Sequence, residues 1–129
     1  MLAIDTNVVV RFLINDHHVQ SAKARDLIKG SEIFVPTTVL LESEWVLRSV
    51  YGLSGQQIAA ALRTFAGLPN VTLEDPALAA FGFECGERGM DFADALHLGR
   101  AQDCESFVTF DRRLQNAAKA QGLENVRAP

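Results

Sequence analysis

Four acidic side chains stand where a carboxylate is either unexpected or well placed to do chemistry. Asp5 and Asp111 each follow a short apolar run, the position of a residue that ends a strand of a parallel sheet. Glu42 interrupts the apolar stripe of a predicted helix, and Asp94 stands in the first turn of another. Carboxylates that share one crevice repel each other unless a cation neutralises them, and hard divalent ions prefer oxygen ligands. Asp5, Glu42, Asp94 and Asp111, called the four acids below, therefore suggest a metal site.

Each of these acids also has a structural explanation. An acid at the end of a strand commonly caps the helix that follows, which would account for Asp5 and Asp111. Asp91 and Asp94 have the spacing of a capping arrangement at a helix start. Glu42 could pair with a nearby arginine or lie at the solvent edge of its stripe. For each acid taken alone, these alternatives stay open.

Polar and basic residues surround the acids in the sequence. Hydroxyl and amide groups flank Asp5 and Asp111 and are suited to hold water or phosphate. They belong to Thr6, Asn7 and Thr109. Arginine can position a phosphate backbone without reading its sequence, and the candidates are Arg11, Arg48, Arg112 and Arg113. Solvent exposure or pairing with acids explains each of these arginines equally well. For His97, one turn after Asp94, we favour a structural or solvent role.

The pattern of apolar residues predicts the elements that position the acids. Strands are expected at 2–4, 33–35, 71–73, 106–110 and 124–126, and helices at 7–13, 19–29, 37–51, 75–86, 91–104 and 112–121, with another that opens on the capping box of Ser54 and Gln57. Alternating units of this kind favour an α/β fold with a mainly parallel sheet and helices on both faces. We expect 2–4 to be a buried central strand. In the helix over 37–51, the stripe of Val39, Glu42, Val46 and Val50 is expected to be buried and Glu44 to be solvated.

Composition sets the broad class of the protein. A chain of 129 residues, 48% hydrophobic and 22% charged, fits a single globular domain over 1–129. No apolar run reaches the ~18 residues of a membrane helix, and no signal-peptide pattern is present, so we expect a cytoplasmic protein without a membrane partner. Cys85 and Cys104 are expected to be buried free thiols. The formal charge of −4 argues against nucleic-acid binding by bulk charge, but the four acids account for all of it.

Taken together, the motifs resemble those of PIN-domain nucleases, and more narrowly those of the VapC-like toxins of bacterial toxin–antitoxin pairs. The resemblance spans nearly the whole chain and rests on four segments, which are Asp5-Thr6-Asn7, Val39-Leu40-Leu41-Glu42, Asp91-Phe92-Ala93-Asp94-Ala95-Leu96-His97 and Thr109-Phe110-Asp111-Arg112. It implies an α/β/α sandwich with a mainly parallel five-stranded sheet. It also implies endonucleolytic cleavage of RNA by a water that Mg²⁺ or Mn²⁺ activates.

Residue by residue, the resemblance makes the four acids the catalytic, metal-binding positions. Thr6 or Asn7 and Thr109 match its accessory polar positions, and Asp91 lies outside the basic four-acid pattern. The resemblance further implies a cognate antitoxin protein and a homodimer. Large apolar residues that could line an antitoxin groove or a dimer interface, and that could equally belong to the core, are Phe12, Leu13, Trp45, Val50 and Tyr51.

Two other classes of function fit parts of the pattern. One is a different Mg²⁺-dependent phosphohydrolase, such as a phosphatase with an aspartyl nucleophile. That chemistry commonly uses a second acid two residues after the first, and this chain has Asn7 there. The other is a nonenzymatic nucleic-acid-binding module, against which the presence of all four acids argues.

Overall fold

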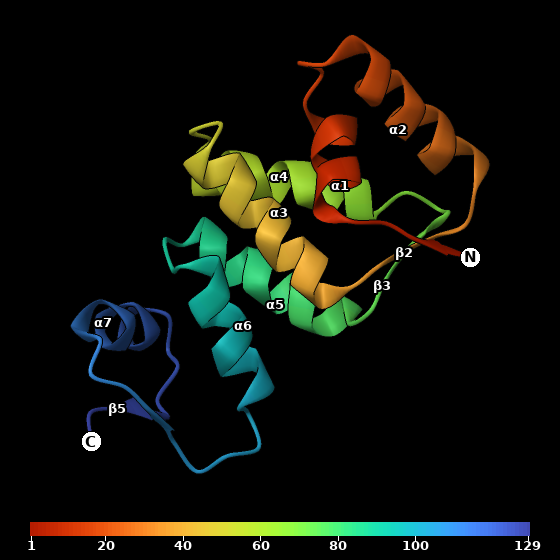
Figure 1. The fold of residues 1–129 in the computed structure, drawn as a ribbon. Helices are drawn as coiled ribbons and strands as arrows, with labels where there is room; N and C mark the ends of the chain where they lie inside the picture. The colour runs from red at the N-terminus through yellow and green to blue at the C-terminus, as the bar shows by residue number, and fades with distance from the viewer. The chain divides into compact units, whose positions relative to one another are not determined.

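The structure, a computed structural model, describes residues 1–129 as alternating helices and short strands. The chain groups into two compact units, residues 1–76 and residues 77–129. Unit 1 contains β1 (Leu2–Ala3), α1 (Thr6–Leu13), α2 (His18–Gly30), β2 (Ile33–Val35), α3 (Thr37–Ser49), α4 (Gly55–Ala66) and β3 (Val71–Leu73). Unit 2 contains α5 (Pro76–Glu87, which begins at the boundary), α6 (Phe92–Arg100), β4 (Phe107–Val108), α7 (Arg112–Ala120) and β5 (Val126–Arg127). Figure 1 shows this order along the chain from red to blue.

Unit 1 is built on a three-stranded parallel sheet with the order β1-β2-β3. Leu2 pairs with Ile33, which in turn pairs with Val71. β3 is at a sheet edge, as expected. The prediction of a buried central first strand is wrong for this sheet, because β1 is also an edge strand and Leu2 is 48% exposed. β2, paired on both sides, is the central strand, and its Ile33 and Val35 are buried.

The helices of unit 1 follow the sequence pattern closely at their starts. α4 begins on the predicted capping box: Ser54 accepts a hydrogen bond from the backbone N–H of Gln57, whose side chain accepts one from the N–H of Ser54. α1 packs against both α2 and α3. The ring of Phe12 on α1 lies 5.5 Å from the ring of the buried Phe65 on α4. This packing holds together α1, which Asp5 precedes, and α3, which contains Glu42.

The buried face of α3 differs from the predicted one. The buried residues are Leu40, Ser43, Glu44 and Leu47, whereas Glu42 is exposed. The predicted stripe therefore lies on a neighbouring side of the helix, where Val39 and Val46 are half-buried and Glu42 and Val50 are exposed. Glu44 is only 6% exposed and accepts a 2.7 Å hydrogen bond from Nε of Arg48, one turn later. The spacing of Glu44 and Arg48 was the sequence signal for this buried ion pair.

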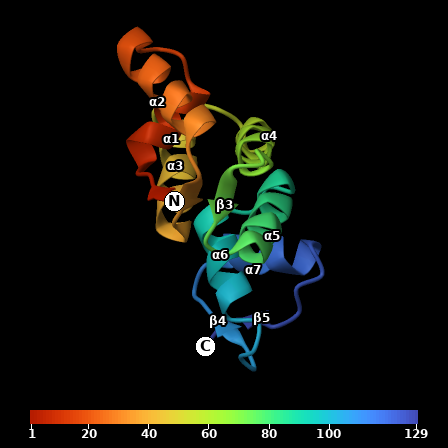
Figure 2. The same ribbon diagram turned by 90° about the vertical axis from the view of Figure 1, so that its right-hand side faces the viewer.

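Unit 2 combines three helices with a two-stranded sheet. β4 and β5 pair in parallel, with Phe107 opposite Val126, and Figure 2 shows them side by side. The core joins residues of α5, α6, α7 and the connection between α5 and α6, and its buried members are Cys85, Met90, Ala95, Leu98, Leu114 and Ala118. Burial raises the pKa of the Cys85 thiol. Cys104 is free as predicted but exposed, because α6 ends at Arg100 rather than continuing through Cys104.

A close approach between α5 and α6 depends on two glycines. A Cβ atom at Gly99 would lie 2.4 Å from Cδ1 of Leu78, and one at Gly82 would lie 2.7 Å from Cε1 of Phe92. Real Cβ atoms essentially never lie so close to another atom, so a side chain at either position would force the Leu78 or Phe92 side chain to shift. The rings of Phe83 and Phe92 stack across the same contact at 5.7 Å.

The α/β class with parallel strands is confirmed. All five strands pair in parallel, and seven helices separate them in the chain, consistent with a PIN-like α/β/α fold. No helix has both the length and the apolar character needed to cross a membrane.

Candidate active site

The acids of unit 1 lie at the start of α1 and one turn into α3. Asp5 caps α1, where its Oδ1 accepts a 3.2 Å hydrogen bond from the backbone N–H of Val8. The hydroxyl of Thr6, the first residue of α1, donates a hydrogen bond to Oε1 of Glu42. The bond between Thr6 and Glu42 links the two helices at the point where both acids are found. The structure therefore gives Glu42 a hydroxyl partner in place of the arginine considered above.

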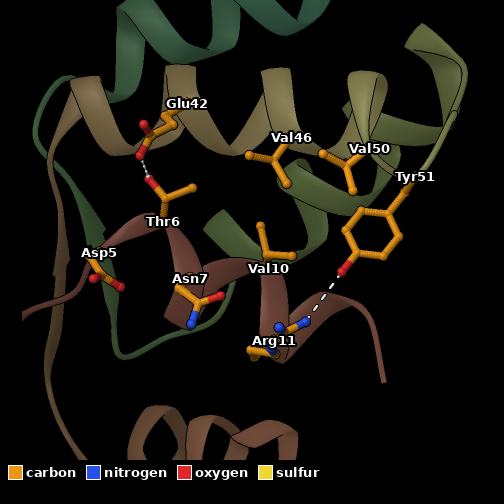
Figure 3. Close-up of a pocket in the computed structure, with 9 residues that line it drawn as sticks. All are labelled: Asp5, Thr6, Asn7, Val10, Arg11, Glu42, Val46, Val50 and Tyr51. Carbon is orange, nitrogen blue, oxygen red and sulfur yellow. Dashed lines mark hydrogen bonds between the residues drawn. The ribbon is translucent and has the colours of Figure 1, made fainter. Parts of the chain in front are cut away.

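A hollow of about 440 Å³ lies between α1 and α3. Its lining residues are Asp5, Thr6, Asn7, Val10, Arg11, Glu42, Val46, Val50 and Tyr51. Figure 3 shows Asp5, Thr6 and Glu42 at one end, the valines in the middle, and Tyr51 with Arg11 at the other end. The structure thus brings together two of the four acids, two predicted accessory residues and one predicted arginine in a single concave site.

The end of the hollow opposite the acids is held by a network that the sequence did not reveal. The Tyr51 hydroxyl donates to Oδ2 of Asp16 at 2.8 Å, and Nη1 of Arg11 donates to Oδ1 of Asp16 at 3.0 Å. Nη1 also donates to the Tyr51 oxygen at 3.3 Å, and Nε of Arg11 donates to Gln20 at 2.8 Å. The hydrogen bond from Tyr51, with the charge of Arg11, lowers the pKa of Asp16, and the same bond raises the pKa of Tyr51.

The acids of unit 2 lie at the starts of α6 and α7. Asp91 caps α6 by accepting a 3.1 Å hydrogen bond from the backbone N–H of Asp94, so its capping explanation is correct. Asp111 caps α7 by accepting bonds from the N–H groups of Arg113 at 2.9 Å and Leu114 at 3.2 Å. Its own N–H donates to Oγ1 of the predicted accessory residue Thr109 at 3.0 Å.

Three carboxylates of unit 2 interact unfavourably. Burial raises the pKa of Asp94, and the negative charges of Asp91 and then Asp111 raise it further, while His97 opposes the shift. Asp94 therefore holds its charge at a cost that a nearby cation would remove. The proximity of Asp111 to Asp94 follows from the fold, since 17 residues separate them in the chain.

The arginine candidates fall into two groups. Arg11 and Arg48 are engaged with Asp16 and Glu44 respectively, so the alternative of pairing with acids is correct for both. Arg112 and Arg113 are exposed in the first turn of α7, directly after Asp111. The second group is therefore the more accessible to a phosphate.

The donor chemistry of the acids within each unit fits a hard divalent cation. Asp5, Asp91 and Asp111 each use Oδ1 in the cap, so the hydrogen bonds of Asp5 and Asp111 leave Oδ2 of each without a partner. The helix starts at Asp5 and Asp111 thus orient a carboxylate while keeping one oxygen available to a metal. Within neither unit, however, do three histidine, cysteine or acidic side chains already stand in the arrangement that would hold a metal ion.

Carboxylate oxygens oriented at helix starts are the kind of ligand that hard divalent ions prefer, and such ions serve phosphate chemistry in many enzymes. The model of the PIN domain family matches residues 2–120, so the chain belongs to that family. PIN domains are generally Mg²⁺-dependent nucleases that act on nucleic acids, which supports nuclease chemistry at the level of the family. No curated protein and no solved structure matches this chain.

Proposed function

We propose that this chain is a Mg²⁺- or Mn²⁺-dependent endoribonuclease in which the four acids are the metal ligands. The observation that carries the proposal is the family membership over residues 2–120, a range that contains all four acids. Two features of the molecule support it. Asp5 and Glu42 line one hollow in unit 1, and Asp94 in unit 2 has a pKa raised by burial and by the charges of neighbouring carboxylates.

We assign a separate role in this reaction to each group of residues. A bound divalent ion supplies Lewis-acid polarisation of the scissile phosphodiester and lowers the pKa of a water. Asp5 and Asp111 offer Oδ2 while backbone N–H groups hold Oδ1, and Thr6 fixes one oxygen of Glu42. Such fixed ligands reduce the reorganisation that accompanies metal binding. Arg112 and Arg113 are placed to contact phosphates of the RNA.

The direct test is cleavage of single-stranded and structured RNA in Mg²⁺ or Mn²⁺. We expect Asp5→Asn and Asp94→Asn to lose activity at least ~100-fold, since each removes a charged metal ligand. Asn can still cap a helix, so Asp5→Asn tests the charge rather than the fold. Matched controls are Asp26→Asn in unit 1 and Asp103→Asn in unit 2, both exposed acids, which should cleave like wild type. Equal cleavage by all variants would refute the proposed site.

Metal binding gives an independent reading. Isothermal titration calorimetry with Mn²⁺ should show binding to wild type that weakens at least ~10-fold in Asp5→Asn and in Asp94→Asn. A chain that binds metal but turns over small phosphate esters with a phosphorylated Asp5 would be a phosphatase instead. A chain that binds RNA without cleaving it under any divalent metal would be a nonenzymatic module.

We further propose that the nuclease is the homodimeric toxin of a toxin–antitoxin pair. The resemblance to VapC-like toxins supports this, together with Trp45, 54% accessible on α3, since exposed aromatic residues are enriched at protein interfaces. Expression should arrest bacterial growth, and Asp5→Asn should abolish the arrest at equal protein levels. Growth without arrest, or a monomer by light scattering, would refute the corresponding part of this proposal.

A further inference from the structure

The hollow of unit 1 extends well beyond its acidic end. Asp5, Thr6 and Glu42 occupy one end, and the remaining walls come from apolar side chains and from the Tyr51–Arg11 pair. A metal ion needs only the acids. The rest of this space, within a total of about 440 Å³, has the size and mixed lining of a small-molecule site.

We propose that this hollow is a nucleobase subsite, with a preference for guanine, beside the scissile phosphate. The inference rests on the proposed ribonuclease function and names a residue, Arg11, that selects the base. Neither the family match nor the four acids specify such a subsite.

The middle of the hollow suits the faces of a flat base. Val46 and Val50 project from α3 toward Val10 on α1, as Figure 3 shows. Val10 is buried, Val46 is half-buried, and Val50 is exposed, so the apolar wall runs from the core to the surface. A base inserted here would be covered by valine methyl groups while its ribose and phosphate stay toward solvent and the acids.

The far end of the hollow offers hydrogen-bond donors in a fixed position. Nε of Arg11 is bonded to Gln20, and Nη1 is bonded to Asp16 and Tyr51. These three bonds hold the guanidinium plane and leave Nη2, with two N–H groups, without a partner. The Nη2 amino group can only donate, so it suits the edge of guanine on which O6 and N7 are both acceptors, whereas adenine presents an amino donor beside N7.

The charges at the two ends of the hollow favour the same orientation of a nucleotide. The acids, once they hold a cation, attract the phosphate, and the donors of Arg11 attract the acceptor edge of the base. A peptide carboxylate could also reach the cation, but it offers no flat ring for the valine walls and no acceptor edge for Arg11. The combination therefore fits a nucleotide better than an acidic protein segment.

The chain offers a direct spectroscopic probe, because Tyr51 is its only tyrosine and Trp45 its only tryptophan. We would titrate protein carrying isotope-labelled tyrosine and tryptophan with guanosine, adenosine, cytidine and uridine, in the absence of metal, and follow both rings by NMR. Nucleosides are used because a phosphate would be repelled by metal-free Asp5 and Glu42. We expect a saturable shift of the Tyr51 signal, tightest for guanosine, with Trp45 unmoved.

Two variants test the geometry. Val46→Phe fills the hollow and should weaken guanosine binding at least ~10-fold. The exposed Val50→Phe does the same from the surface without touching the core, should Val46→Phe prove unstable. The matched control is Val19→Phe, an exposed valine on α2 outside the hollow, which should bind as wild type does. Arg11→Lys keeps the charge but removes the Nη2 group and the bonds that fix it, and should bring guanosine down to the level of the other nucleosides.

The outcomes separate this inference from the proposed function. Absence of a saturable Tyr51 shift with every nucleoside, or a shift that Val46→Phe leaves unchanged, overturns the subsite. Equal affinity for all four nucleosides overturns the role of Arg11 in selecting guanine. If RNA is cleaved at positions that are the same in wild type and Val46→Phe, the nuclease stands and the subsite falls. Nucleoside binding without RNA cleavage would support the subsite and refute the ribonuclease function.

Discussion

Asp111 has two roles that one pair of substitutions can separate. Its Oδ1 caps α7 through the N–H groups of Arg113 and Leu114, and its Oδ2 is proposed to bind metal. Asparagine keeps the capping oxygen and removes the charge, whereas alanine removes both. The two variants should therefore be equally inactive but differently stable.

The expected magnitudes follow from the cap. Loss of an N-cap side chain costs about 1 kcal/mol in the free energy of unfolding, and loss of a negative charge at a helix N-terminus costs a few tenths more. The charge of Asp111 also raises the pKa of Asp94, so removal of that charge relieves some repulsion and offsets part of the second cost. We expect Asp111→Ala to lower the free energy of unfolding by about 1 kcal/mol and Asp111→Asn by less than about 0.5 kcal/mol.

The assay is urea unfolding without metal, followed by circular dichroism, beside RNA cleavage with Mg²⁺. With a slope of about 1.5 kcal/mol per molar urea, the alanine variant should unfold about 0.7 M earlier than wild type, and the asparagine variant within about 0.3 M. Cleavage should fall by at least ~100-fold in both. An active Asp111→Asn would refute the metal role, and an alanine variant as stable as wild type would refute the capping argument.

Three further predictions concern packing and protonation. Gly99→Ala should lower the free energy of unfolding by about 1–3 kcal/mol, because its Cβ would meet a leucine side chain at 2.4 Å. In the control Gly86→Ala the new Cβ has nothing within 4 Å, so this change should be neutral or stabilising by up to about 1 kcal/mol. Similar thermal midpoints for the two variants would contradict this prediction. Folding raises the pKa of Asp94 above 3.8, so the free energy of unfolding of wild type falls as the pH rises from 3.8 through the raised pKa. Without metal, Asp94→Asn should therefore be more stable than wild type, and by a larger margin at about pH 7 than at about pH 4. Tyr51→Phe removes the hydrogen bond that most lowers the pKa of Asp16, so an NMR titration should show that pKa rising toward 3.8. A lowered pKa stabilises the fold above 3.8, and this gain is lost as the pH falls from 3.8 through the lowered pKa. The loss of stability caused by Tyr51→Phe should therefore be smaller at acid pH.

The elements that could be predicted from sequence are those with a local signal. Ser54 and Gln57 define a capping box within four residues, and the structure has it in full. The strand at 33–35 was predicted to the residue, because three apolar side chains end at a proline. The capping alternatives for Asp5, Asp91 and Asp111 were correct for the same reason: a cap depends only on the next three residues.

The features that could not be predicted depend on packing over long distances in the chain. Glu42 and Glu44 are two residues apart on α3, and only the packing of that helix decides that Glu44 is buried and Glu42 faces the hollow. The hydrogen bond of Tyr51 with Asp16 joins residues 35 positions apart, and no sequence motif predicts it. The position of β1 in its sheet likewise depends on which strands pair with it. Whether the four acids bind one metal site stays a prediction.

The capping role of Asp5, Asp91 and Asp111 has a consequence for how this protein can evolve. Active-site acids usually reduce stability, so that their loss is tolerated or even favoured when function is no longer selected. Here an acid-to-alanine change removes a helix cap, so selection for folding would also act on two of the proposed catalytic positions, Asp5 and Asp111. Descendants that lose the nuclease activity should therefore first acquire asparagine or serine at these sites, because both side chains can still cap a helix. Such substitutions would identify inactive descendants that still fold.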